Sequence, residues 1–365
     1  MNIILIILVF GVIIFFHELG HFIVAKINHI TVKEFSMGFG PKLFQFHKKE
    51  TQYTLRLIPL GGYCMMLSED DEENENDENS FEKKSIWARM AVVLAGPAMN
   101  FVIAFLFSMV IIHFCGSDPA IIGAVYNKDN IEKYQIENAE EYFNGVYPAE
   151  EAGISDGDRV LKIEGSTVKN FRELQIYLQI YGDGSPIDLT LEKEDGTVYD
   201  TTVHPAKTPD GYKIGIMSVG YQLPKNFGEL CKYSAYETRY WVKATFLSLK
   251  LIVTRQVSSD EVSGPVGVAK NMNDTFNEAA KSSVLDLFLN WMNYIVLLSA
   301  NLGVMNLLPI PGLDGGRFIF LLIEAVTRKK VPKDKENIVT LIGFVLVMLL
   351  MVVILFNDIK NEFFH

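Results

Sequence analysis

The sequence predicts an α-helical polytopic membrane protein with four transmembrane helices, a membrane-associated β-hairpin region and one extracytoplasmic α/β domain. The first observation is that the 365-residue chain contains four long apolar stretches. They cover residues 3–27, 90–114, 284–308 and 338–356, and each approaches or exceeds the roughly 20 residues that cross a bilayer core. The second observation is that the region between the middle two stretches has the composition of an ordinary soluble domain.

The distribution of basic residues predicts the orientation of the helices. Cytoplasmic loops of membrane proteins carry an excess of Lys and Arg. The loops that follow the first helix and precede the fourth share this excess: Lys26, Lys33, Lys42, Lys48, Lys49, Lys83, Lys84, Arg89, Arg328, Lys329, Lys330, Lys333 and Lys335. We therefore expect both loops in the cytoplasm, and the N-terminus, the central domain and the C-terminus outside it. The acidic run at residues 69–78 counts little in this rule and is expected to be a solvated loop.

Charge and cysteine content exclude several classes of protein. A formal net charge of −11 argues against a nucleic-acid-binding protein, which would present a basic surface. The three cysteines, Cys64, Cys115 and Cys231, are far apart, so neither a disulfide framework nor a cysteine-based metal site is expected. We expect the first apolar stretch to be retained, because it lacks the basic start of a cleaved signal peptide.

The first apolar stretch contains three ionisable residues, which are costly in a bilayer and therefore suggest a function. His17, Glu18 and His21 occur in the order HELGH. Positions i and i+4 lie on one face of a helix, so the two imidazoles can bind one metal ion, for which zinc is well suited. Glu18 can then take a proton from a water that zinc has acidified and pass it to the leaving amine. Pairing of these residues with other helices is the structural alternative.

The third apolar stretch ends in NLLPIPGLDGG at residues 306–316, where the prolines and glycines would break a helix. Broken backbone at membrane depth is tolerated where it is buried in protein or lines a wet cavity. Asp314 lies in this break and is the best candidate for a third metal ligand, with a helix N-cap as the alternative. Asn306 could donate a hydrogen bond to a substrate carbonyl or to the developing oxyanion.

Two further segments are candidates for substrate contacts. Gly61 and Gly62 follow an alternating segment at residues 53–58 that predicts a strand, and an unpaired strand edge could hold an extended peptide by β-augmentation. Asn100 ends the small-residue segment AGPAMN at the start of the second helix. It is a candidate for a hydrogen bond across helices or to substrate, with close helix packing as the alternative.

The central region contains PAEEAGISDGDRVLKIEG at residues 148–165, which is similar to the PDZ pattern of a turn, Gly-Asp and a strand. A helix is predicted at 171–181 and strands at 187–192 and 198–203. We expect one PDZ-like domain at residues 116–206, which either binds an extended peptide or excludes large substrates. Residues 233–253 predict an amphipathic helix on the outer membrane face.

The motifs HELGH, GGY, GPAMN, GPVG at residues 264–267 and NLLPIPGLDGG together resemble the site-2 protease family of intramembrane metalloproteases, in particular its bacterial RseP/RasP-type branch. The resemblance covers nearly the whole chain. It implies one Zn²⁺ per chain held by His17, His21 and Asp314, Glu18 as the catalytic base, and Asn306 as a substrate-contacting residue. Cys64-Met65-Met66 stand where the family often has a lysine, which puts the substrate contacts of this loop in doubt.

The predicted organisation is a first half of the protease core at residues 1–115, the PDZ-like domain at 116–206, a linker with an interfacial helix at 207–283, and the second half of the core at 284–365. The resemblance implies an endopeptidase of the bacterial cell membrane that cuts transmembrane segments. Its implied substrates are membrane proteins trimmed beforehand by another protease, with anti-sigma factors and remnant signal peptides as classes. The alternatives are a non-catalytic scaffold that binds peptides through the PDZ-like domain, and a zinc transporter.

Overall fold

The computed structural model describes residues 2–67, 77–128, 143, 145–254 and 264–363. Most of the acidic run expected as a loop therefore lies outside the described residues. The chain forms two compact units, of which one contains residues 1–108 and 241–365 and the other residues 109–240. The helices of the first unit, two of which are shared with the second, are α1 (Asn2–Ile27), α2 (Ile86–Cys115), α6 (Phe227–Val253), α7 (Pro265–Ser282), α8 (Val284–Leu307), α9 (Asp314–Thr327) and α10 (Lys333–Phe363).

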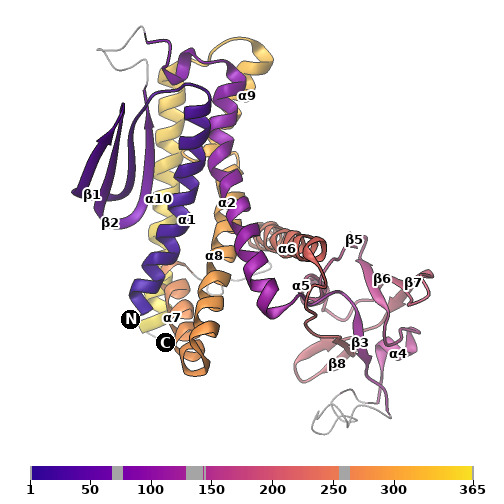
Figure 1. The fold of residues 1–365 in the computed structure, drawn as a ribbon. Coiled ribbons are helices and arrows are strands. Elements are labelled where there is room, and N and C mark those ends of the chain that lie inside the picture. The colour runs from indigo at the N-terminus through magenta and orange to yellow at the C-terminus, as the bar shows by residue number, and fades with distance from the viewer. Residues whose placement is uncertain (1, 68–76, 129–142, 144, 255–263, 364–365) are drawn as a thin grey trace. The chain divides into compact units, whose positions relative to one another are not determined.

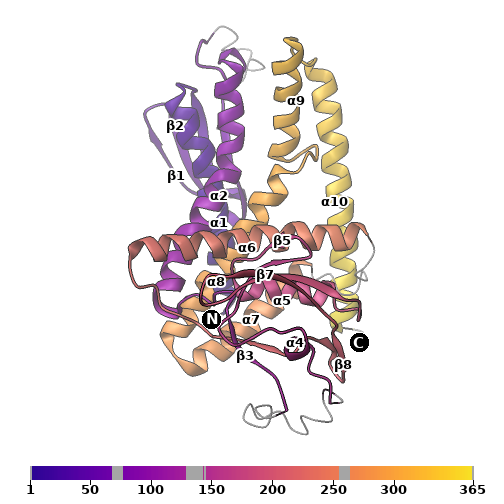
Figure 2. The ribbon, with the colours of Figure 1, turned by 90° about the vertical axis from the view of Figure 1, so that its right-hand side faces the viewer.

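Four helices in the described part of the chain are long and apolar enough to cross a membrane. They are α1, α2, α8 and α10, which confirms the four stretches expected from the sequence. Only 6% of the apolar window of α10 is buried in the protein, so its leucine and valine side chains require an apolar surrounding such as lipid. Figure 2 shows α9 after a break at the end of α8, in agreement with the prolines and glycines between them.

The core of the first unit lies between α1, α2, α7 and α8. Val9 and Ile13 of α1 pack with Ile103 of α2, Phe276 of α7 and Ile295 of α8, and all five are almost fully buried. Helix α7 also contacts α10, and Figure 1 shows the two chain ends beside α7 at one end of this bundle. Both ends therefore lie on one side of the spanning helices, as an even number of crossings requires.

A sheet formed by β1 (Val32–Lys48) and β2 (Thr51–Met66) lies along α1 (Figure 1). Residues 34–37 of β1 lie between two segments of β2, because they pair with residues 52–55 and also with residues 62–65. Among the described residues, the segment 62–66 pairs with β1 alone, so its other side is a free edge toward α1. Apolar side chains on the sheet are exposed, in keeping with a membrane-associated sheet: Phe39, Leu43, Phe44, Phe46, Leu57 and Ile58.

The second unit is an α/β domain. Its elements are β3 (Ile122–Val125), α4 (Pro148–Glu151), β4 (Arg159–Ile163), β5 (Ser166–Thr167), α5 (Phe171–Ile180), β6 (Ile187–Glu192), β7 (Val198–Val203), β8 (Ala206–Thr208), β9 (Gly211–Lys213) and β10 (Ile216–Ser218). The strand order of the main sheet is β5-β4-β6-β7, and its core contains Ile163, Leu174 and Leu191. Strands β6 and β7 coincide with the predicted ones, and α5 ends one residue earlier.

The second compact unit continues past residue 206, where we expect the PDZ-like domain to end. Strand β10 pairs with β3 at the start of the domain, and the compact unit continues to Tyr240. The expected linker also contains two long helices, α6 and α7. The pairing of β10 with β3 could not be predicted from the sequence, because a strand of three residues carries too little periodicity to be recognised.

Candidate metal centre and catalytic site

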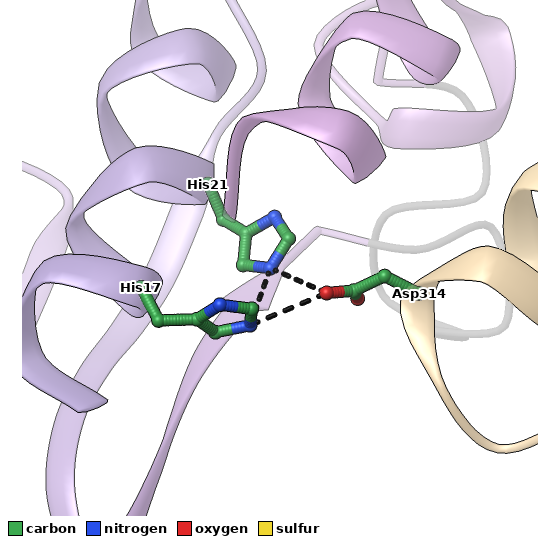
Figure 3. Close-up of side chains that lie close together, drawn as sticks. All are labelled: His17, His21 and Asp314. Carbon is green, nitrogen blue, oxygen red and sulfur yellow. Dashed lines mark hydrogen bonds and ion pairs between the residues drawn. The ribbon is translucent and has the colours of Figure 1, made fainter. Parts of the chain in front are cut away.

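Three side chains from distant parts of the sequence meet inside the first unit (Figure 3). His17 and His21 come from successive turns of α1, and Asp314 is the first residue of α9. The two Nε2 atoms are 3.3 Å apart, and the Asp314 Oδ2 atom lies 3.2 Å from that of His17 and 3.4 Å from that of His21. The structure therefore brings together the three residues predicted as metal ligands.

The donor set fits a tetrahedral zinc ion. Ligand atoms at about 2.0–2.2 Å from zinc lie roughly 3.3–3.6 Å from one another in tetrahedral geometry, which is close to the three observed separations. Both histidines are 8% exposed, and Asp314 Oδ2 is buried without a well-formed hydrogen bond. A buried carboxylate oxygen without such a partner is costly, and a bound cation would remove that cost.

The His21 imidazole is oriented by the backbone of α2. Its Nδ1 atom lies 2.8 Å from the carbonyl oxygen of Val92, and a carbonyl can only accept. Nδ1 therefore carries the proton and donates it, which leaves the Nε2 lone pair free to bind a metal. Nothing in the sequence signals this contact, because any residue supplies a backbone carbonyl.

Gly96 allows α2 to approach the two histidines. A Cβ atom added at Gly96 would lie 2.3 Å from Nε2 of His21 and 2.8 Å from Cε1 of His17. Where α1 crosses α2, a Cβ at Gly20 would lie 2.3 Å from the carbonyl oxygen of Ala95. The small residues of AGPAMN thus permit the close helix packing expected from the sequence, and they also leave space for the imidazoles.

Asp314 reaches the histidines because the chain reverses tightly between α8 and α9. Gly312 has φ +97°, and a Cβ at Gly315 would lie 2.2 Å from the carbonyl oxygen of Leu308, so this turn excludes larger residues at both positions. Leu313, and not Asp314, occupies the N-cap position of α9, which argues against the N-cap alternative for Asp314.

An ion pair fixes α9 against α2 farther along the helix. Arg89 of α2 donates two hydrogen bonds, of 2.5 and 3.1 Å, to the carboxylate of Glu324. The arginine is 6% exposed, and such bidentate pairs hold both partners in one geometry. The pair therefore helps to keep the N-terminus of α9, and Asp314 with it, next to α1.

Glu18 lies in the wall of a pocket of about 370 Å³ that also contains the three candidate ligands. The backbone of Cys64, on the free edge of the sheet, lies close to the Glu18 carboxylate. A Cβ at Gly62 would lie 3.1 Å from Cγ of Glu18, so the edge strand packs directly on the helix. The pocket is lined further by residues of the edge strand and the loop after it: Tyr63, Cys64, Met65, Met66, Leu67 and Phe81.

The Cys64 thiol is half-buried and lies near Glu18. Burial, together with the nearby negative charge of Glu18, raises the pKa of the thiol to about 12. The thiolate, which is the reactive and ligating form, is therefore scarce at neutral pH.

The residues predicted to contact the substrate fall into two groups, those on the side of the ligand atoms or the sheet edge and one behind His17. The Asn306 amide nitrogen lies 3.4 Å from Nε2 of His17, on the side of the ligand atoms, and Gly62 lies beside Glu18. Gly61 adopts φ +96° at the start of the edge segment. Asn100 instead lies at Nδ1 of His17, behind the imidazole, and is fully buried, so it does not face the pocket as a substrate-binding residue would.

Comparisons with known proteins agree with this geometry. The family described as peptidase family M50 matches residues 5–350. A protein of Clostridium acetobutylicum is 38% identical over 98% of this chain and 97% of its own length. The zinc metalloprotease RasP of Geobacillus kaustophilus is 32% identical over 99% of this chain and 98% of its own length. The regulator of sigma-W protease RasP of Bacillus subtilis is 29% identical over 98% of each chain.

Proposed function

The chain belongs to peptidase family M50 and is a zinc metalloendopeptidase of the membrane, and on this basis we propose which residues act and on what. His17, His21 and Asp314 hold the zinc ion, and Glu18 is the catalytic base. The single observation that carries the proposal is the set of three ligand atoms 3.2–3.4 Å apart in a pocket that also contains Glu18. The scaffold alternative gives no reason for this donor set.

Proton transfer is the role of Glu18 in the proposed reaction. A zinc ion held by the three ligands would supply Lewis acidity, which brings the pKa of a coordinated water toward about 7. Glu18 accepts a proton as the water oxygen forms its bond to the scissile carbonyl carbon. It returns that proton to the peptide nitrogen as the C–N bond breaks, so that a carboxylic acid and an amine leave. Asn306, from the ligand side of His17, donates a hydrogen bond to the carbonyl oxygen.

The free edge of the β sheet is the proposed binding place for the substrate chain. A transmembrane helix hides its carbonyls in backbone hydrogen bonds, so the segment must be extended before it can be cut. The edge at residues 62–66 offers backbone partners to an extended peptide, and residues 63–66 of this edge line the pocket beside Glu18. Gly61 and Gly62 belong to this substrate-binding edge.

The proposed orientation follows from the basic loops, which place residues 28–85 and 328–332 in the cytoplasm. His17 and His21 then lie toward the cytoplasmic half of the membrane, and the N-terminus, the second unit and the C-terminus lie outside the cytoplasm. We infer that the second unit is PDZ-like, because it has a Gly157-Asp158 turn before β4 and a groove beside α5. In this position it can bind the outer end of a substrate or exclude bulky ones.

A substrate comparison tests the proposal that trimming comes first. The full-length enzyme in vesicles is given one transmembrane segment, either with a folded outer domain or with that domain removed. We expect the trimmed form to be cut at least about tenfold faster, because the folded domain hinders access to the site. Mass spectrometry of the products should locate the cut within the apolar segment. Equal rates would contradict the requirement for trimming, and a zinc-loaded protein that cuts neither form would favour the scaffold.

A further inference from the structure

A buried amide lies at the Nδ1 edge of the His17 imidazole, on the side away from the ligand atoms. Asn100 of α2 is completely buried, and its Nδ2 atom lies 3.1 Å from Nδ1 of His17. Its Oδ1 atom is also buried and has no hydrogen-bond partner. The two ends of an amide have nearly the same shape, so half a turn of the side chain presents the oxygen to Nδ1 instead.

A metal ion on Nε2 of His17 determines which end of the Asn100 amide must face Nδ1. A neutral imidazole carries one proton, and a zinc ion on Nε2 leaves that proton on Nδ1. Nδ1–H then needs an acceptor. Val92 provides one to His21 through its carbonyl, and Asn100 is the only described group that lies at the corresponding atom of His17. The opposite arrangement, with Nδ2 donating to Nδ1, leaves the proton on Nε2 and blocks the ligand atom.

We infer that Asn100 is a positioning residue, which selects the metal-binding tautomer of His17 by accepting the Nδ1–H hydrogen bond through Oδ1. This inference rests on the proposed function, because it presupposes zinc on Nε2 of His17. It replaces the substrate contact expected from the sequence, and it explains why the amide lies behind the imidazole. It also gives the last residue of GPAMN a role that helix packing alone does not provide.

The test measures zinc affinity of the full-length protein in detergent, by competition with a chelator of known affinity. For Asn100→Ala we expect zinc binding about 10- to 100-fold weaker than in the wild type, as is common when an outer partner of a ligating histidine is removed. Asn100→Asp offers only acceptor atoms, so its affinity should stay close to that of the wild type or exceed it. Ser108→Ala is the matched control, because Ser108 is a buried polar residue of the same helix away from the site.

Three variants separate the possible roles of Asn100. If Asn100 donated to His17, Asn100→Asp would bind zinc as weakly as Asn100→Ala, and the inference would be wrong. If Asn100 only filled space, Asn100→Leu, which has a similar volume but no acceptor atom, would bind zinc as tightly as the wild type, and this would also overturn the inference. Unchanged affinity in Asn100→Ala would also overturn it. Excess zinc should restore most of the cleavage rate of Asn100→Ala, whereas a raised KM at full zinc occupancy would indicate a substrate contact. A wild type that binds no zinc would contradict the proposed function itself, which is a different outcome.

Discussion

Replacement of Glu18 by Gln is expected to stop peptide cleavage and to leave zinc bound. The amide has nearly the same shape as the carboxylate but cannot accept the proton of the attacking water. General-base groups contribute about 10²- to 10⁴-fold to such reactions, so the rate should fall by at least that factor. Glu18 is not one of the three ligands that surround the metal centre, and the zinc content should therefore stay near one per chain. Cleavage of a transmembrane substrate in vesicles and metal analysis of the same sample measure both quantities.

Glu50→Gln is the matched control for Glu18→Gln. Glu50 forms an exposed ion pair with Lys26 at 2.7 Å, and exposed pairs of this kind contribute little. We expect this control to cleave at the rate of the wild type. Undiminished cleavage in Glu18→Gln would contradict the assigned role, and simultaneous loss of zinc would show that Glu18 acts through the metal site instead.

Replacement of Asp314 by Asn is expected to remove zinc and activity together. The neutral amide oxygen is a much weaker ligand than the carboxylate, and two histidines alone do not complete a catalytic zinc site. The fold should survive, because Leu313, and not Asp314, occupies the N-cap position of α9 and the bidentate pair of Arg89 with Glu324 remains. Zinc per purified chain should fall toward zero, while the thermal unfolding midpoint of the metal-free variant should match that of the metal-free wild type.

Asp286→Asn tests whether this loss is specific to Asp314. Asp286 also lies in the first turn of a helix, α8, where it pairs with Ser283 and is half-buried. This control should keep its zinc. Full zinc occupancy in Asp314→Asn would exclude the carboxylate as a ligand, even if the variant were inactive for another reason.

Part of the site could be predicted because helix periodicity relates neighbouring residues. The spacing of His17 and His21 fixes both side chains on one face of a helix, whatever the rest of the fold does. The contact with Asp314 is of another kind, because it joins residues almost 300 positions apart. The sequence indicated that Asp314 lies in a broken helix, and the resemblance to a known family indicated its role. Only the packing of α9 against α2 and α8 brings the carboxylate to the two imidazoles.

The features that the sequence did not predict depend on backbone atoms and on close approach. The Val92 carbonyl has no sequence signal, and the position of Asn100 behind His17 depends on how α2 crosses α1. The sequence indicated that Gly96 is a small residue that permits packing, but it did not indicate that Gly96 lies against both imidazoles. The double pairing of residues 34–37 also could not be predicted, because side-chain alternation does not specify which strand lies on each side.

The most direct test of the metal centre is zinc K-edge X-ray absorption on the purified full-length protein. We expect one zinc per chain, with two imidazole nitrogens and at least one oxygen at about 2.0–2.2 Å. The spectrum should lack sulfur at about 2.3 Å, because no cysteine of the described residues belongs to the group of ligand atoms at this site. A spectrum with these ligands would support the site formed by His17, His21 and Asp314. A sulfur ligand, a single imidazole or a protein without zinc would contradict it.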